Sequence, residues 1–257
     1  MKNLIKSILI CMLVVGCNKT ESPDKQITKE IILDNYYKAI GGYDNLKNIK
    51  TLKKTGTYIE PKYNLIGFAG VDKKRPNLRV ISALGEEGAP TVMEGYNGSV
   101  GWEYFKGSDI VYSEGEAKRV ILRGAEFDFP FIDADEKGHV LTYQGITNLD
   151  GIYVYTLRVK FEDDFIDDFY FDTKTFLVLG HRKTQPIHAV GKDYNIVEHY
   201  SNFKSVNGVL FPFNFIERDQ DTGKFLNAVI IHEISANVDF PSNHFDPPIH
   251  LAKKNKQ

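Results

Sequence analysis

The residue types that could support catalysis do not occur at the spacings that catalysis requires. Asn97-Gly98-Ser99-Val100-Gly101 departs from the Gly-x-Ser-x-Gly nucleophile elbow, because asparagine stands two residues before the serine. Ser99 is therefore predicted to be a turn residue. The seven histidines form neither His-x-His nor His-Glu-x-x-His, and the neighbours His232 and Glu233 would point to opposite faces of a strand. We predict no enzymatic activity, no metal ion and no cofactor.

An acidic segment is the remaining candidate for cation binding. Glu162-Asp163-Asp164 and Asp167-Asp168 could gather around calcium, which accepts carboxylate oxygens in a flexible geometry. The spacing lacks the glycine and the closing glutamate of a calcium loop. The favoured interpretation is a solvated, charged hairpin turn, whose charges would discourage edge-to-edge strand pairing.

The N-terminal segment has the pattern of a secretory signal. Two lysines precede an apolar run from Ile8 to Val15, which is too short to span a bilayer. Val14-Val15-Gly16-Cys17 then matches the lipobox of bacterial lipoprotein precursors. The alternative is an ordinary signal peptide that happens to contain a cysteine. We expect residues 1–16 to be removed and Cys17 to carry the acyl chains, such as palmitate.

This processing limits the possible functions. The other cysteine, Cys11, lies in the removed segment, so disulfides, cysteine catalysis and thiolate metal sites are excluded. Removal of two lysines changes the formal charge from 32 − 34 = −2 to 30 − 34 = −4, which gives no indication of nucleic acid as a partner. Several acyl chains would hold the protein on a membrane. Asn18, which is not an aspartate, favours the outer membrane; the periplasmic and external faces both remain open.

One domain is predicted to follow the anchor. Residues 17–26 are polar and are expected to form a tether, and residues 251–257 form a polar tail. Residues 27–250 contain no internal repeat, low-complexity tract or linker after residue 30, so a single domain is the simplest organisation.

Two helices are predicted at the start of this domain. Apolar residues between Ile32 and Ile40 recur at helical spacing after Thr28, which is suited to cap a helix, and Gly41-Gly42 ends the pattern. A second, short helical piece is expected over about residues 44–49.

From Leu52 onward a period of two predicts roughly ten or eleven antiparallel strands. The clearest spans residues 153–161, and another spans Val209 to Phe215 after the hairpin turn Asn207-Gly208. Asp221-Thr222-Gly223 separates that strand from one over residues 225–235.

A predicted helix over Glu114 to Leu122 interrupts the strands and runs into Phe127-Asp128-Phe129-Pro130-Phe131. A helix inserted between strands of an antiparallel sheet usually covers the apolar face of that sheet. We therefore expect this segment to act as a lid.

Four local patterns occur in a characteristic order. Lys74-Arg75-Pro76-Asn77-Leu78 precedes a strand, Tyr96-Asn97-Gly98-Ser99-Val100-Gly101-Trp102-Glu103-Tyr104 combines a glycine turn with a tryptophan strand, a helix follows, and Phe245-Asp246-Pro247-Pro248 closes the domain. In order and spacing, over roughly residues 27–250, these patterns resemble the LolA/LolB-like outer-membrane lipoprotein-sorting proteins.

The resemblance implies a mainly β (α+β) fold, an incomplete antiparallel β-barrel around a hydrophobic cavity that helices plug and acyl chains occupy. Arg75 matches the arginine that, in the soluble carrier of that family, hydrogen-bonds the lid helices and holds the empty cavity shut. The alternative for Arg75 is a solvated charge beside Lys73 and Lys74.

The chain also departs from this family. The soluble carrier is not lipidated, so Cys17 is more similar to the membrane-bound receptor, whose protruding apolar loop has no match in this sequence. The helix and Phe-Pro-Phe segment match the carrier's lid only loosely. Because one fold supports several functions, the resemblance supports the fold better than the sorting pathway.

Strand residues with large apolar side chains could line such a cavity, or could instead fill a closed core. Trp102 could touch a ligand or merely anchor its hairpin. The candidates for the cavity wall are Trp102, Tyr153, Tyr155, Leu157, Phe211 and Phe213.

Two functions are therefore carried forward. The first is a membrane-anchored envelope lipoprotein that binds acyl chains of a lipid or lipoprotein in a cavity and takes part in lipoprotein or lipid sorting at the outer membrane. The second is an envelope sensor or scaffold that uses the same fold to bind a protein partner.

Overall fold

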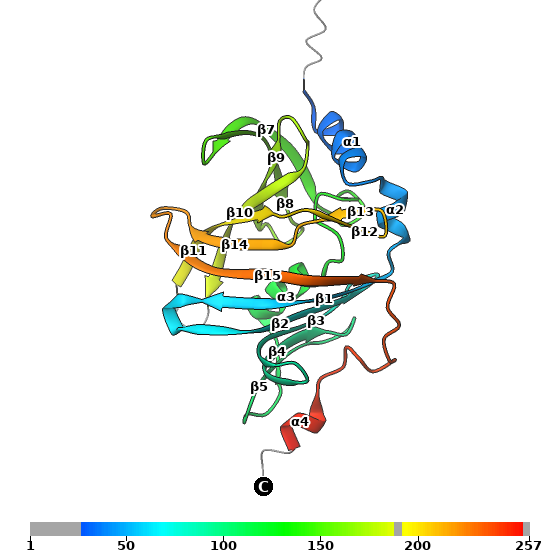
Figure 1. Cartoon of the computed structure of the whole chain (residues 1–257), viewed down its shortest axis with the longest axis vertical. Helices are drawn as coiled ribbons and strands as arrows, with labels where there is room; N and C mark the ends of the chain where they lie inside the picture. Colours follow the sequence, from blue (N-terminus) through cyan, green and yellow to red (C-terminus); the bar gives the residue numbers. More distant parts are fainter. Residues whose placement is uncertain (1–26, 188–191, 254–257) are drawn as a thin grey trace, which may run out of the picture.

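The computed structural model describes residues 27–187 and 192–253, and one large antiparallel sheet is the main element of the fold (Figure 1). Thirteen strands follow the spatial order β6-β5-β4-β3-β2-β1-β15-β14-β11-β10-β9-β8-β7, and β12 and β13 pair separately. The sheet is not closed, because β6 and β7 lie at its two ends. The predicted fold class, a mainly β incomplete antiparallel barrel with helices, is confirmed. The sheet has more strands than the ten or eleven expected, because strands as short as β6 offer too few positions to show a period of two.

The elements have the following bounds. The helices are α1 (Lys29–Ala39), α2 (Tyr43–Asn48), the 3-10 helix η1 (Pro61–Tyr63), α3 (Gly115–Ala125) and α4 (Ile249–Lys253). The strands are β1 (Thr51–Glu60), β2 (Leu65–Lys74), β3 (Leu78–Glu86), β4 (Ala89–Tyr96), β5 (Gly101–Phe105), β6 (Val111–Tyr112), β7 (Val140–Leu149), β8 (Ile152–Lys160), β9 (Ile166–Asp172), β10 (Val178–Ile187), β11 (Lys192–Ser201), β12 (Lys204–Val206), β13 (Val209–Phe211), β14 (Asn214–Asp219) and β15 (Phe225–Ala236).

The two N-terminal helices form where the sequence predicts them. The Thr28 side chain caps α1 by accepting a hydrogen bond from the Ile31 amide. Gly41 ends the helix at φ +103°, and a Cβ there would lie 2.0 Å from the Gly208 carbonyl oxygen. Only glycine permits this close approach, which places the end of α1 against the β12-β13 hairpin (Figure 1).

The main core fills the space between α1 and the half of the sheet formed by β7 to β10. Tyr36 of α1 packs edge-on against Phe131 and Phe171, with ring centroids 5.2 and 5.7 Å apart. Phe131 also contacts Phe169, 5.1 Å away. These rings come from a helix, a loop and β9, so burial of this aromatic cluster holds the N-terminal helix on the sheet.

A second, smaller core lies on the other face of the sheet, at β3 to β5. Trp102, fully buried, packs there with Val80 and Phe245, and its indole nitrogen donates to the Phe245 carbonyl oxygen over 3.0 Å. A Cβ at Gly95 would lie 2.3 Å from the indole ring, so glycine provides the space for it. The C-terminal segment is thereby attached to the convex face.

One predicted strand is divided in the structure. The run from Val209 to Phe215 was expected to form one strand, but β13 ends at Phe211 and β14 begins at Asn214. Pro212 has no backbone N–H to donate to a ladder, which favours a break at this point. The two halves therefore belong to different sheets.

The acidic segment only partly matches its prediction. Residues 162–164 form an exposed turn between β8 and β9, as expected, but Asp167 and Asp168 are buried. The prediction that both are solvated is wrong, because β9 turns the first inward and the second outward into contact with Arg158 and Arg182.

Within residues 27–187 and 192–253, no helix is long and apolar enough to cross a membrane. Cys17, the tether and the end of the polar tail lie outside the described residues.

Candidate ligand-binding cavity

The concave face of the sheet encloses a cavity of about 730 Å³. Its wall combines strands from both halves of the sheet, β1 to β4 on one side and β9 to β11 with β14 and β15 on the other. α2, α3 and residues 126–132 cover it. Its volume falls in the range of about 300–1,000 Å³ that is usual for small-molecule sites. Apolar side chains on the wall include Leu52, Val71, Phe127, Phe129, Phe169, Phe211, Phe215 and Ile231.

The predicted lid helix takes its expected position over the sheet. Val120 and Ile121 of α3 face the cavity, and the chain continues through Phe127, Phe129 and Pro130, which also line it. The helix contacts β3, β4 and β5. The helix and the Phe-Pro-Phe segment therefore form one continuous cover, which we call the lid (residues 115–132).

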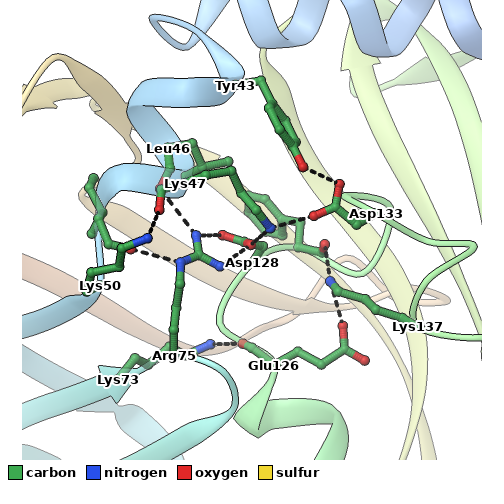
Figure 2. A network of polar contacts seen from close by, with 12 residues as sticks. Tyr43, Leu46, Lys47, Lys50, Lys73, Arg75, Glu126, Asp128, Asp133 and Lys137 are labelled. Carbon is green, nitrogen blue, oxygen red and sulfur yellow. Dashed lines mark hydrogen bonds and ion pairs between the residues drawn. The ribbon is translucent and has the colours of Figure 1, made fainter.

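Arg75 joins the lid to the N-terminal helices (Figure 2). Its guanidinium forms two hydrogen bonds with the Asp128 carboxylate, of 2.5 and 2.7 Å. The same side chain donates to the carbonyl oxygens of Ile49 (2.8 Å) and Leu46 (3.2 Å) at the end of α2. Paired hydrogen bonds between arginine and a carboxylate are strong and geometrically specific. One residue in the β2-β3 turn thus ties together α2 and the lid.

Further contacts reinforce this connection, and we call the whole group the clamp (Tyr43, Lys47, Arg75, Asp128 and Asp133). The Lys47 ammonium lies 3.4 Å from Asp128 and 2.5 Å from Asp133, and the Tyr43 hydroxyl donates to Asp133 over 2.9 Å (Figure 2). Burial acts to raise the pKa of Asp133, but the hydrogen bonds from Lys47 and Tyr43 hold that pKa below its ordinary value. Every charge in the clamp has an opposite charge within 4.0 Å.

Three basic side chains line another part of the cavity wall, on β1, β2 and β3. We call Lys54, Lys73 and Arg79 the cationic wall. The Lys73 ammonium donates to the Glu126 carbonyl oxygen over 2.5 Å, and Arg79 donates to Glu94 over 2.7 Å. Burial lowers the pKa of Lys54 to about 8 and lowers the pKa of Lys73 well below its ordinary value.

An acidic band crosses the cavity wall on β9, β10, β11 and β14. Asp167 lies opposite Lys183, which forms an ion pair of 3.3 Å with Glu217. Burial raises the pKa of Asp167 to about 7 and also raises the pKa of Glu198. Although burial acts to lower the pKa of Lys183, the carboxylates of Glu217, Glu198 and Asp167 raise it overall. One oxygen of Asp167 is buried without a hydrogen-bond partner.

A buried histidine completes this band. His181 Nδ1 lies 2.5 Å from the Tyr200 hydroxyl, which in turn donates to Glu198 over 3.0 Å. Burial lowers the pKa of His181 well below its ordinary value, so the imidazole is neutral. The expectation of a purely hydrophobic cavity is thus too simple, because charged side chains occupy two sides of an otherwise aromatic and aliphatic wall.

The six residues predicted to line the cavity are placed differently from one another. Phe211 lies on the cavity wall. Tyr155, Leu157 and Phe213 belong to the main core, because α1 and residues 127–132 fill the space over their part of the sheet. These three residues therefore fill a core and do not line the cavity, which is the alternative that the sequence left open.

The prediction is wrong for Trp102 and Tyr153. Trp102 lies on the convex face, because it stands opposite Gly95 in the β4-β5 register and packs on the C-terminal segment. Tyr153 is 66% exposed, because it lies at the end of the β7-β8 hairpin, beyond the part of the sheet that the core covers.

The charged side chains of the cavity were missed by sequence reasoning. Lys54 comes two residues after Leu52, and Asp167 comes two residues before Phe169. Since residues two apart in a strand point to the same face, each charge occupies an inward position of its strand. A lysine or aspartate at an inward position is the signal that could have identified them, since unpaired charges are rarely placed in a core.

Comparisons with known proteins agree on the fold. No protein-family model matches the sequence, and no curated protein matches it. A DUF1329 family protein from Desulfovibrio piger aligns with a TM-score of 0.57 and 14% identity, covering 84% of this chain and 96% of that one. A LolA superfamily protein from Nitrosomonas europaea aligns with a TM-score of 0.55 and 12% identity, covering 86% and 98%.

A third structure, from Vibrio parahaemolyticus, is described as an outer membrane lipoprotein-sorting protein domain. It aligns with a TM-score of 0.56 and 8% identity, covering 84% of this chain and 94% of that one. These likenesses extend over almost the whole of each neighbour. The described part of the chain therefore has a LolA-like fold.

Proposed function

We propose that this LolA-like chain is a lipid-anchored lipoprotein of the cell envelope that binds acyl chains of a lipid or lipoprotein in the cavity. Its role would be lipoprotein or lipid sorting at the outer membrane. The observation that carries this proposal is the covered cavity of about 730 Å³ on the concave face of the sheet.

The character of the wall supports an apolar ligand. Phe127, Phe129, Phe211 and Phe215 present aromatic rings to the cavity from the lid and from the opposite strands. Each methylene group transferred from water to such a surface contributes about 0.8 kcal/mol. An acyl chain can therefore bind without any directional contact along its length.

The clamp supplies a way to control access. The Arg75 side chain donates hydrogen bonds to the lid and to the end of α2 and is not part of the cavity wall, so its contacts oppose movement of the cover. A ligand that enters must offset the free energy needed to separate these groups. Arg75 would in this way act as a latch that keeps the empty cavity closed.

The N-terminal sequence supports the location. Lipidation of Cys17 would attach the domain to a membrane through the tether of residues 17–26, and Asn18 favours the outer membrane. We propose binding and transfer as the role, without catalysis. Transfer would require only an acceptor that holds the acyl chain more tightly.

Native mass spectrometry of the full chain, released from bacterial membranes together with its anchor, tests this function. We expect a co-purifying acyl lipid, identified after extraction, whose occupancy changes in Arg75→Lys and falls in Phe215→Asp. The exposed Tyr63→Asp provides a control outside the cavity.

The opposite result would overturn the proposal. A chain that is empty, and stays empty when acyl lipids are added, would favour the sensor or scaffold that binds a protein partner.

A further inference from the structure

The three side chains of the cationic wall share one face of three adjacent strands. Lys73 stands directly opposite Arg79 in the β2-β3 register, and Leu52 stands opposite Lys73 in the β1-β2 register. Directly opposite residues of an antiparallel pair project from the same face. Lys54, two residues after Leu52, joins that face, and all three basic side chains line the cavity.

These cations are poorly neutralised by the protein itself. Among the described residues, no carboxylate oxygen lies within 4.0 Å of the Lys54 or Lys73 ammonium. Lys54 lies over two aromatic rings, 5.8 Å from the centroids of both Phe211 and Phe215. Glu94 forms its ion pair with Arg79. Three basic groups thus have one carboxylate in contact among the described residues.

The acidic band does not compensate them. Glu198 attracts Lys54 from beyond contact distance, and Asp128 and Glu126 attract Lys73 in the same way. Glu198, Glu217 and Asp167 surround Lys183, which is itself a cation on the cavity wall. These distant attractions do not outweigh the effect of burial. The pKa values of Lys54, Lys73 and Arg79 are all lowered, each chiefly by burial.

The lid is shaped to accommodate this wall. A Cβ at Gly124 of α3 would lie 1.6 Å from Arg79 Nη1, so the guanidinium passes directly against the helix at its one glycine within the last turn. The Lys73 ammonium reaches the lid at the Glu126 carbonyl. The cationic wall therefore lies between the strands and the lid and is partly shielded from solvent, which would strengthen its interaction with a bound anion.

We propose that Lys54, Lys73 and Arg79 bind the anionic headgroup of an amphiphile, a carboxylate or a phosphate, while its acyl chain lies along the aromatic part of the cavity. This inference rests on the proposed function and specifies its ligand. An oxyanion between the three strands would supply the missing negative charge, and it would accept hydrogen bonds from two ammonium groups and a guanidinium. The protein thereby selects acidic amphiphiles over neutral ones of the same chain length.

The experiment uses the full chain in lipid nanodiscs at pH 7 and three photoactivatable probes with the same C16 chain. The probes are palmitate, 1-palmitoyl lysophosphatidate and the neutral 1-monopalmitoylglycerol, and crosslinking to the protein band gives a half-saturating concentration for each. The variants are Lys54→Met and Lys73→Met. The matched control is Lys53→Met, because Lys53 is exposed on the other face of β1.

We expect at least one acidic probe to saturate at a concentration about 10-fold or more below that of the neutral probe, as one or two charge-assisted hydrogen bonds provide. Lys54→Met should abolish most of this preference, Lys73→Met should reduce it, and Lys53→Met should leave it unchanged. The better of the two acids identifies the headgroup as a carboxylate or a phosphate. Circular dichroism of each variant verifies that it is folded.

Two results would overturn the anion site, and they are distinguishable. If all three probes saturate equally, or if Lys54→Met keeps the preference, the cavity binds acyl chains but has no anion site. If none of the three crosslinks saturably, acyl binding itself fails, and the anion site fails with it.

Discussion

The clamp and the cationic wall are both built from basic side chains near the cavity, but their charges are balanced in different ways. In the clamp, Arg75 and Lys47 surround the buried Asp128, whose carboxylate accepts hydrogen bonds from both. In the cationic wall, Lys54 and Lys73 have no carboxylate in contact among the described residues. One region is electrostatically complete within the chain, and the other is not.

This difference separates a structural role from a binding role. A buried cation with its own carboxylate contributes to holding elements together, and breaking such a pair is costly. A cation that lines a cavity without a carboxylate in contact destabilises the empty protein, so it is retained at the expense of stability. Mutations in the two regions are therefore expected to have opposite effects on stability.

The largest expected effect concerns the centre of the clamp. Asp128→Asn would leave Arg75 and Lys47 without their shared carboxylate, and loss of one partner of a buried ion pair costs about 3–5 kcal/mol. We expect a decrease of this order in the free energy of unfolding, measured by urea denaturation. Asp135→Asn, at an exposed position in the same segment, is the control and should change stability by less than about 0.5 kcal/mol. Equal effects of the two variants would refute a central role for Asp128.

A smaller effect is expected from a change that keeps the charge of the clamp. Arg75→Lys cannot form the two parallel hydrogen bonds to Asp128 or reach both carbonyl oxygens of α2, so we expect a loss of roughly 2 kcal/mol. Amide hydrogen exchange should accelerate in residues 126–132 while it stays slow in β8 and β9. Uniform acceleration would mean that Arg75 stabilises the whole domain and does not act as a latch.

In the cationic wall, removing a charge is expected to stabilise the protein. Lys54→Met should raise the free energy of unfolding by about 1–2 kcal/mol at pH 7, because the ammonium, which lines the cavity, has no ionic partner in contact among the described residues. The folded pKa of Lys54 is about 8, below the ordinary 10.5, so the unfolded chain binds more protons between these values. The penalty in the wild type is therefore complete below pH 8 and disappears as pH rises to about 10.5.

Thermal denaturation of both proteins from pH 7 to pH 10 measures this dependence. Lys53→Met should show no such gain at any pH. A decrease in stability for Lys54→Met would mean that the lysine is neutralised inside the empty protein, and the contrast with the clamp would be lost.

The acidic band offers a smaller, pH-dependent test. The folded pKa of Asp167 is about 7, above the ordinary 3.8, so the native state binds more protons between these values. The wild type therefore loses stability from this group as pH rises from about 4 to 7. Above pH 7, the free energy of unfolding of Asp167→Asn should exceed that of the wild type by roughly 1 kcal/mol. This difference should shrink as the pH falls toward 4. Asp164→Asn, at an exposed position in the preceding turn, should give no gain above pH 7.

How far the sequence predicts this molecule differs between its elements. α1 with its Thr28 cap, the glycines that end it and the lid helix were all predictable, because local spacing determines them. Arg75 was identified only by its motif, and its contacts with α2 depend on chain segments more than 20 residues away. Trp102 and Tyr153 were misplaced because alternation predicts that residues share a face but does not tell which face is concave. The cationic wall required the register of three strands, which no local pattern contains.

The smallest change in stability is expected from a variant that moves one basic group of the cationic wall without removing its charge. Gly124→Ala retains all three basic residues, but its methyl group would occupy the place of Arg79 Nη1 and displace the guanidinium. The gain of about 1 kcal/mol from alanine in a helix should offset the weakened Arg79–Glu94 hydrogen bond of similar size, so the free energy of unfolding should stay almost constant. The preference for acidic over neutral probes should nevertheless fall several-fold, whereas the exposed helix variant Lys118→Ala should keep it. An unchanged preference in Gly124→Ala would show that Arg79 contributes only general positive charge, and that the two lysines alone define the anion site.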